Sequence, residues 1–201
     1  MNMDTAFCFD LDGTLTKEEL LPLIARCAGC HEEINALTRA TLDGVIPFES
    51  SFKLRCKLLQ DVNISAVQSL IAKVDLFEKM LHYIKLNKDI CFVITGNLDV
   101  WIEPLIKRIG CKFFCSTANT EQDRLIGIKE IAHKGVYVNN LRKRFKKIVA
   151  IGDGMGDVNL FEQADYSIAF GAVHFPVQSL IELANYVVFD ESALCRLLNT
   201  L

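Results

Sequence analysis

Short apolar runs that each end in a polar cluster are the main pattern of this chain. The first run, Phe7–Phe9, stops at the motif Asp10-Leu-Asp-Gly-Thr14. A continuous apolar run favours a strand that is buried on both faces, because a half-exposed strand would alternate apolar and polar residues. Similar runs at 90–94 and 148–151 end in polar clusters at 95–97 and 152–157. Parallel strands align their carboxyl ends, so we expect the three clusters to meet at one edge of a sheet.

From about Leu76 onward, stretches with helical periodicity alternate with these strands. The alternation predicts an α/β fold, a Rossmann-like parallel sheet flanked by helices. Apolar stripes predict helices over 77–84, 102–109, 135–146 and 194–201, and strands are predicted at 112–115, 166–169 and 186–189. Turn-forming residues leave both a hairpin and a loop open for 117–127.

The segment 17–75 has helical periodicity and few β-branched runs. Val67, Leu70, Ile71 and Val74 form one apolar stripe, and the polar residues at 63 and 65 are of the type that caps a helix. We therefore predict a small all-helical cap (17–75), inserted after the first strand of an α/β core made of 1–16 and 76–201.

Composition excludes several classes of protein. The 201 residues carry a formal charge of −3, and 51% of them are hydrophobic. Nucleic-acid-binding proteins are usually basic, so we expect no nucleic-acid partner and interpret the basic cluster at 142–147 as the solvated end of a helix. No run is long enough to cross a membrane, and the acidic N-terminal region is unlike a signal peptide, so we expect a cytoplasmic protein with reduced cysteines in its core.

Cys27-Ala-Gly-Cys30-His31 matches the haem-attachment string, and with Cys111 and Cys115 it could form a zinc site. The missing export signal argues against haem, and the absence of a second C-x-x-C argues against zinc. Cys27 also continues a helical apolar series from Leu20, which predicts that its thiol is buried.

Asp10 and Asp12 lie on the same face of an extended strand and repel each other unless a cation, a basic group or a proton intervenes. Mg²⁺ is the expected cofactor, and it would allow one carboxylate to act as a nucleophile and the other as a general acid/base. The alternative is an ordinary polar turn after a strand. Asp153 can complete an oxygen-only metal site, which favours the metal.

The remaining polar groups suit a phosphate. The Thr95 hydroxyl and the Gly96 N–H can donate to phosphate oxygens, and Lys134 can offset negative charge in the transition state. The alternative for Lys134 is a solvated surface lysine.

These motifs together resemble the haloacid dehalogenase superfamily of phosphohydrolases, most of all its phosphoserine phosphatase branch. The resemblance covers essentially the whole chain and implies that Asp10 is the nucleophile and Asp12 the acid/base. It also implies that Mg²⁺ is held by Asp10, the Asp12 carbonyl and Asp153, with support from Asp157. Asn97 and Gly156 depart from the residues that are common in the family.

The cap stretch 37–55 also resembles that branch. It places Phe48 and Arg55 in the cap, and it places Glu19 where the branch has an acidic residue that reads the substrate's amino group. A guanidinium binds a carboxylate bidentately, so Arg55 with Glu19 would suit an amino-acid phosphate. The alternative is an ordinary solvated helix surface.

The resemblance implies a Mg²⁺-dependent phosphomonoester hydrolase for a small phosphorylated metabolite, with O-phosphoserine as one candidate. The alternatives are a different small phosphate ester, a phosphotransferase, and a non-catalytic binding protein on the same fold. The sequence leaves the oligomeric state open.

Overall fold

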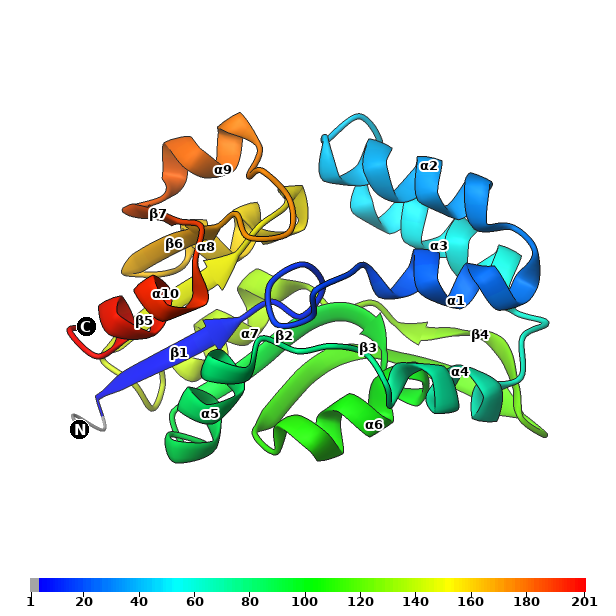
Figure 1. Cartoon of the computed structure of the whole chain (residues 1–201), viewed down its shortest axis with the longest axis horizontal. Coiled ribbons are helices and arrows are strands. Elements are labelled where there is room, and N and C mark those ends of the chain that lie inside the picture. Colours follow the sequence, from blue (N-terminus) through cyan, green and yellow to red (C-terminus); the bar gives the residue numbers. More distant parts are fainter. Residues whose placement is uncertain (1–3) are drawn as a thin grey trace.

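The computed structural model describes residues 4–201 and contains a seven-stranded sheet in the order β4-β3-β2-β1-β5-β6-β7 (Figure 1). Neighbouring strands are parallel except for the antiparallel pair β3/β4. No residue of the central strand β1 is more than 3% exposed, as expected of a strand that is covered on both faces. The strands are β1 (Thr5–Phe9), β2 (Cys91–Leu98), β3 (Lys112–Glu121), β4 (Arg124–Glu130), β5 (Lys147–Gly152), β6 (Tyr166–Phe170) and β7 (Tyr186–Val188). The predicted α/β class is confirmed.

Helices cover both faces of this sheet (Figure 1). On one face α5 (Glu78–Leu86) contacts α6 (Asp99–Ile109) and α10 (Glu191–Leu198). On the other, α8 (Val158–Glu162) contacts α7 (Lys134–Leu141) and α9 (Gln178–Leu183). A 3₁₀ turn, η1 (Met155–Asp157), connects β5 to α8.

The helices α1 (Leu20–Ala28), α2 (His31–Leu42) and α3 (Phe48–Leu59) pack on one another beyond the carboxyl end of β1 (Figure 1). The chain leaves and re-enters the sheet region at one place, because Thr16 pairs with Leu76 and the Lys17 N–H donates to the Asp75 carbonyl at 3.0 Å. The fourth helix, α4 (Ile64–Ile71), lies against α6, and the Gln68 amide donates to the Val100 carbonyl at 2.7 Å.

Several predicted boundaries were wrong, among them that of the closing helix, which spans Glu191–Leu198 instead of 194–201. Strand β2 does not end at Ile94 but continues to Leu98, with a register shift against β3 after Ile94. Helix α7 ends at Leu141, short of the predicted end at Lys146. Arg142, Lys143 and Arg144 lie in the turn beyond it, where Arg142 pairs with Asp165 at 3.0 Å, and Lys147 begins β5.

The segment 117–127 is a hairpin, because β3 continues to Glu121 and returns as β4. Gln122 and Asp123 form its tip with φ values of 51° and 85°. Asp123 meets the start of α4: its carboxylate accepts from the Ser65 N–H at 2.8 Å and from the Ser65 hydroxyl at 2.6 Å. The side chain of Asn63, expected to cap α4, makes no capping hydrogen bond. Asp123 caps the helix instead.

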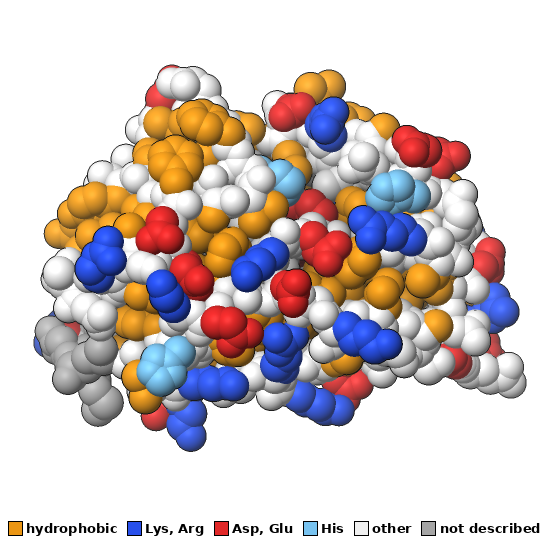
Figure 2. Space-filling view, in the orientation of Figure 1, with side chains coloured by type: hydrophobic (Ala, Val, Ile, Leu, Met, Phe, Trp, Pro, Cys, Tyr) orange, Lys and Arg blue, Asp and Glu red, His pale blue; other side chains and the backbone are white. Residues whose placement is uncertain are grey.

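Acidic and basic side chains are interspersed on the face shown in Figure 2. Large apolar side chains are exposed near the sheet edge at β7, among them Phe175 (76%) and Phe189 (51%), whose rings stack 5.7 Å apart. Within residues 4–201, no helix combines the length and the apolar character needed to cross a bilayer.

Candidate active site

The polar clusters at the strand ends meet in one cavity of about 390 Å³. The register of the sheet explains this, because Phe9 lies opposite Val93 of β2 and Ile151 of β5. The next residue, Asp10, continues the pairing when its N–H donates to the Ile151 carbonyl at 2.8 Å. All the candidate residues identified from the sequence line this cavity: Asp10, Asp12, Glu19, Phe48, Arg55, Thr95, Gly96, Lys134, Asp153 and Asp157.

Three buried carboxylates form the floor of the site. Asp10, Asp153 and Asp157 each offer an oxygen, and these oxygens lie within 4.8 Å of one another. Burial raises the pKa of Asp10 and of Asp153 well above the ordinary value, and the neighbouring acids add to the effect. A cation at this position would therefore favour the ionised carboxylates.

Lys134, the first residue of α7, supplies one such charge. Its Nζ donates to Oδ1 of Asp10 and, at 2.7 Å, to Oδ1 of Asp157. Burial alone would lower the pKa of Lys134, but the charges of the two aspartates outweigh burial and raise it. Lys134, whose side chain is only 10% exposed, is therefore a largely desolvated cation in contact with Asp10, and the alternative of a solvated surface lysine was wrong.

The donor set fits a hard cation such as Mg²⁺. Oδ2 of Asp153 is buried and has no hydrogen-bond partner among the described residues, whereas Oδ1 accepts from the Thr14 hydroxyl at 3.1 Å. A buried carboxylate oxygen that accepts no hydrogen bond is available to a metal ion, because no protein donor satisfies it. Both oxygens of Asp157 already have partners, since Oδ2 accepts from the N–H groups of Asp153 (3.1 Å) and Gly154 (3.2 Å). Asp157 thus orients Lys134 and the Asp153 loop.

Asp12 is held by two donors. Its Oδ1 accepts from the Leu20 N–H at 2.9 Å, and its Oδ2 accepts from the side-chain amide of Asn97. Burial raises the pKa of Asp12 to about 7, and the negative charge of Glu19 adds to the effect. The sequence marked Asn97 only as a departure from the family pattern. The structure shows that this residue contacts the expected acid/base.

Helix α3 meets the end of strand β2 over the expected phosphate site. The Phe48 ring of α3 lies so close to Gly96 that a Cβ there would be 2.2 Å from the ring. Phe48 also stacks on Phe52 at 5.3 Å. Thr95, next to Gly96, is buried, and its hydroxyl oxygen accepts from the Asn97 N–H at 3.2 Å. Gly96 therefore provides the space that lets Phe48 close this side of the cavity.

Arg55 of α3 and Glu19, which precedes α1, line the side of the cavity formed by the helical segment 17–75. Arg55 is only 4% exposed and donates to the Thr38 hydroxyl at 3.1 Å and to the Ser51 carbonyl at 3.4 Å. Burial lowers the pKa of Arg55, and the charges of Glu19 and Asp12 oppose this. Because Arg55 is buried, the alternative of a solvated surface arginine was wrong.

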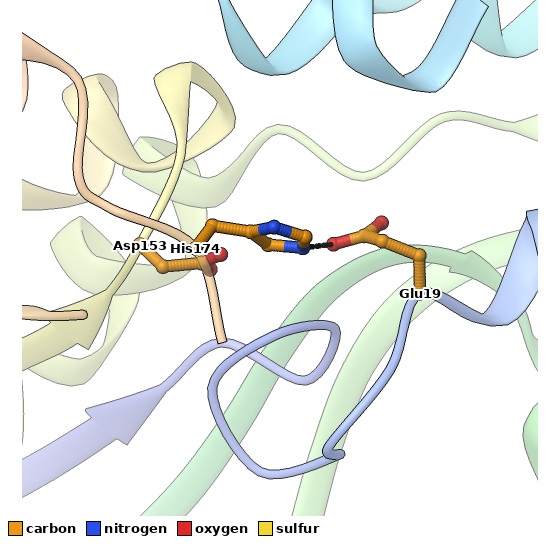
Figure 3. A group of neighbouring side chains, drawn as sticks. All are labelled: Glu19, Asp153 and His174. Atoms are coloured by element: carbon orange, nitrogen blue, oxygen red, sulfur yellow. Dashed lines mark hydrogen bonds and ion pairs between the residues drawn. The ribbon is translucent and has the colours of Figure 1, made fainter. Parts of the chain in front are cut away.

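His174 was missed by the sequence analysis. It lies between β6 and α9, and its Nε2–H donates to Oε1 of Glu19 at 3.1 Å (Figure 3). The hydrogen bond to Glu19 raises the pKa of His174, and burial opposes it only in part. A carboxylate oxygen of Asp153 lies within 4.8 Å of both the Glu19 carboxylate and a ring nitrogen of His174, and Figure 3 shows the three side chains together. A lone histidine in a loop carries no local signal of such a contact.

The cysteine string at 27–31 forms no site. Cys27 is exposed, contrary to the predicted burial, and Nδ1 of His31 is hydrogen-bonded to the Pro22 carbonyl at 2.9 Å. All eight cysteines are free. Across residues 4–201, neither group of side chains that could hold a metal includes a cysteine.

Comparison with known proteins identifies the same family that the sequence motifs resemble. The sequence profile of haloacid dehalogenase-like hydrolases matches residues 7–162. A phosphoserine phosphatase of Methanocaldococcus jannaschii is 30% identical over 178 residues, which are 82% of this chain and 84% of the relative. A phosphoserine phosphatase solved with an analogue of its phospho-aspartyl intermediate has a TM-score of 0.81 and 25% identity, over 94% of this chain and 95% of its own. A substrate-bound phosphoserine phosphatase has a TM-score of 0.86 at 24% identity, over 100% and 99% of the two chains.

Proposed function

This chain belongs to the haloacid dehalogenase-like hydrolases and is a phosphatase-like enzyme of that family, and we propose that it hydrolyses a small phosphate monoester through a phosphorylated Asp10. The observation that carries this proposal is the position of Asp10. It follows the central strand, contacts the largely buried cation Lys134, and lines a cavity that also holds Thr95, Gly96 and Asp153, which are phosphate or metal ligands by type.

In the first step an oxygen of Asp10 attacks phosphorus. The bond from phosphorus to the ester oxygen breaks, and Asp12 protonates the departing alcohol. In the second step Asp12 takes a proton from water, and the water oxygen attacks phosphorus and releases Asp10 and inorganic phosphate. A pKa of about 7 suits Asp12 for both roles, because the group can give and accept a proton near neutral pH.

Mg²⁺, when bound, would offset the charge that gathers on the phosphoryl oxygens. Asp10 and the free oxygen of Asp153 are positioned to hold it, and the family resemblance adds the Asp12 carbonyl. Asp157 supports both Lys134 and the Asp153 loop through its hydrogen bonds. The Thr95 hydroxyl, the Gly96 N–H and Lys134 would donate to the phosphoryl oxygens.

We propose that residues 17–75 are the cap that selects the substrate. A cavity of about 390 Å³ that Phe48 closes against Gly96 suits a small ester. Arg55 brings a buried guanidinium to this cavity, which favours a substrate with a carboxylate. The names of the relatives make O-phosphoserine a first ester to test.

The test is phosphate release from a panel of small phosphate esters, with Mg²⁺ and after chelation. We expect release that needs Mg²⁺ and is abolished in Asp10→Asn, because an amide is a poor nucleophile. Asp89→Asn is the matched control, since Asp89 is exposed and lies outside the cavity, and it should leave the rate unchanged. Equal rates in wild type and Asp10→Asn would rule the proposal out.

A further inference from the structure

Three side chains beside the cavity combine nitrogen and oxygen ligand atoms. Glu19, Asp153 and His174 each offer one such atom, and these atoms lie within 4.8 Å of one another (Figure 3). Glu19 precedes α1, Asp153 follows β5, and His174 belongs to the loop after β6. An imidazole with two carboxylates is a ligand set that suits a borderline divalent ion such as Zn²⁺.

Two carboxylate oxygens in this group have no protein donor. Oδ2 of Asp153 is buried and unpartnered, and Oε2 of Glu19 makes no hydrogen bond to any residue in 4–201. A Cβ at Gly13 would lie 2.4 Å from Oδ2 of Asp153 and 3.1 Å from Cδ2 of His174, the ring carbon that is bonded to Nε2. The free Asp153 oxygen and the Nε2 side of the imidazole therefore border the same small space over Gly13.

The contact between His174 and Glu19 has the spacing of two ligands of one ion. Nε2 and Oε1 are 3.1 Å apart. Zinc bonds of about 2.0 to 2.2 Å place two ligand atoms about 3 to 3.4 Å apart, so an ion can take the place of the proton between these atoms. Nε2 releases that proton when the ion binds. The Asp153 oxygen has to approach by about 1 Å, and the 35% exposed His174 leaves room for water ligands.

The charge of the cavity also favours a second cation. Among residues 4–201, five carboxylates line the cavity in addition to Glu49, which is already paired with Lys53, and only two permanent cations oppose them. One Mg²⁺ offsets two of the three surplus negative charges. The five carboxylates are those of Asp10, Asp12, Glu19, Asp153 and Asp157, and the cations are Arg55 and Lys134.

We propose that Glu19, Asp153 and His174 form a second metal site, which takes a borderline divalent ion such as Zn²⁺ and shares Asp153 with the expected Mg²⁺ site. The imidazole nitrogen selects against Mg²⁺, which prefers oxygen ligands. Two dications on one carboxylate repel each other, so each ion weakens the binding of the other. The inference goes beyond the proposed phosphatase function, because Zn²⁺ binding requires no turnover.

The experiment measures Zn²⁺ affinity on the full chain by competition with a chromophoric chelator, with and without Mg²⁺. Co²⁺ replaces Zn²⁺ in a second measurement, because its absorption spectrum separates thiolate ligands from nitrogen and oxygen ligands. The variants are His174→Ala and Glu19→Gln. The controls are His82→Ala, a histidine on the exposed face of α5, and Cys27→Ala, which removes an exposed thiol. Thermal unfolding shows whether each variant is folded.

We expect wild type to bind one Zn²⁺ and Co²⁺ to give a spectrum without a thiolate charge-transfer band. Loss of a residue that only supports a metal ligand already costs about tenfold or more in affinity. His174→Ala and Glu19→Gln should therefore each weaken Zn²⁺ binding by at least about tenfold. Saturating Mg²⁺ should raise the Kd for Zn²⁺ by about fivefold or more in wild type. His82→Ala and Cys27→Ala should bind Zn²⁺ as wild type does.

Equal Zn²⁺ affinity in wild type and folded His174→Ala would overturn the inference. A thiolate band that disappears in Cys27→Ala would do the same, since it would place the ion at the exposed thiol. A Kd for Zn²⁺ that does not respond to Mg²⁺ would contradict the sharing of Asp153. Phosphate release from p-nitrophenyl phosphate with Mg²⁺ tests the proposed function separately, so that either conclusion can fail while the other stands.

Discussion

A Cβ at position 13 would lie 2.4 Å from Oδ2 of Asp153, the oxygen that has no partner within the described chain, and Gly13 has a φ of +66°. Both facts call for glycine, for different reasons. The positive φ strains any other residue, and the missing side chain leaves room for the Asp153 carboxylate. Gly29 is a control that separates the effect of the backbone angle from the effect of the space. Its φ is +69°, but a Cβ there would have no atom within 4 Å.

Gly29→Ala should lower the free energy of unfolding by about 1 to 2 kcal/mol, the cost of an L-residue in the left-handed region, and Gly13→Ala should lower it by more, because the methyl group also meets the Asp153 carboxylate. Only Gly13→Ala should also raise the Mg²⁺ concentration for half-maximal phosphate release, because it displaces Asp153. Urea unfolding and a Mg²⁺ titration measure the two effects. An unchanged Mg²⁺ midpoint in Gly13→Ala would show that Asp153 is not a metal ligand.

Among the elements, the β3/β4 hairpin stabilises α4 through Asp123. Hydrogen bonds from Ser65 lower the pKa of Asp123, so the stabilisation is present above the unfolded-state pKa of about 4 and is lost as the pH falls through the lower folded-state value. Asp123→Ala should therefore lower the Tm at pH 7, and the difference from wild type should shrink near pH 3.

Asp123→Gly is the variant matched to Asp123→Ala. It also loses the hydrogen bonds to Ser65, but glycine adopts the φ of 85° more readily than alanine does. Its Tm should lie between those of wild type and Asp123→Ala. A Tm for Asp123→Ala equal to that of wild type at pH 7 would show that the capping contact adds nothing to stability.

The elements also show which parts of the secondary structure can be predicted from local sequence. The strands around Phe9 and Ile151 were predicted because continuous apolar runs are a local signal of a buried strand. The extension of β2 was missed because Thr95 and Asn97 are polar, and they are polar because they face the cavity. The residue that caps the N-terminus of α4 could not be predicted from local sequence, since Asp123 lies 58 residues from Ser65.

The same contrast holds within the site. Every candidate residue was identified from the sequence and lines the cavity. Parallel strands bring the residues at their carboxyl ends to one edge, whereas Glu19, Phe48 and Arg55 reach the cavity from the helical segment after β1. The contacts of Asn97 with Asp12 and of His174 with Glu19 were not predicted, since they join segments that only the fold brings together. The catalytic, metal-binding and substrate roles of these residues stay predictions until they are measured.

At the scale of the whole molecule, the pair of His174 and Glu19 ties the proposed cap to the core. Because the pKa of His174 is raised in the folded protein, the pair stabilises the fold fully below the unfolded-state value of about 6.5 and less as the pH rises through the folded-state value. The Tm difference between wild type and His174→Ala should be largest near pH 6 and should vanish near pH 9. The pH profile of His82→Ala should follow wild type, and a difference for His174→Ala that grows toward pH 9 would contradict this assignment.

The central claim is that the phosphoryl group passes through Asp10, and the most direct measurement is to find it there. The enzyme is mixed with a turned-over phosphate ester and Mg²⁺ and quenched in acid within one turnover, and its peptides are examined by mass spectrometry. We predict a phosphoryl group on the peptide that contains Asp10, and none on that peptide in Asp10→Asn. Turnover that leaves the Asp10 peptide unmodified at every quench time, together with activity in Asp10→Asn, would contradict the account.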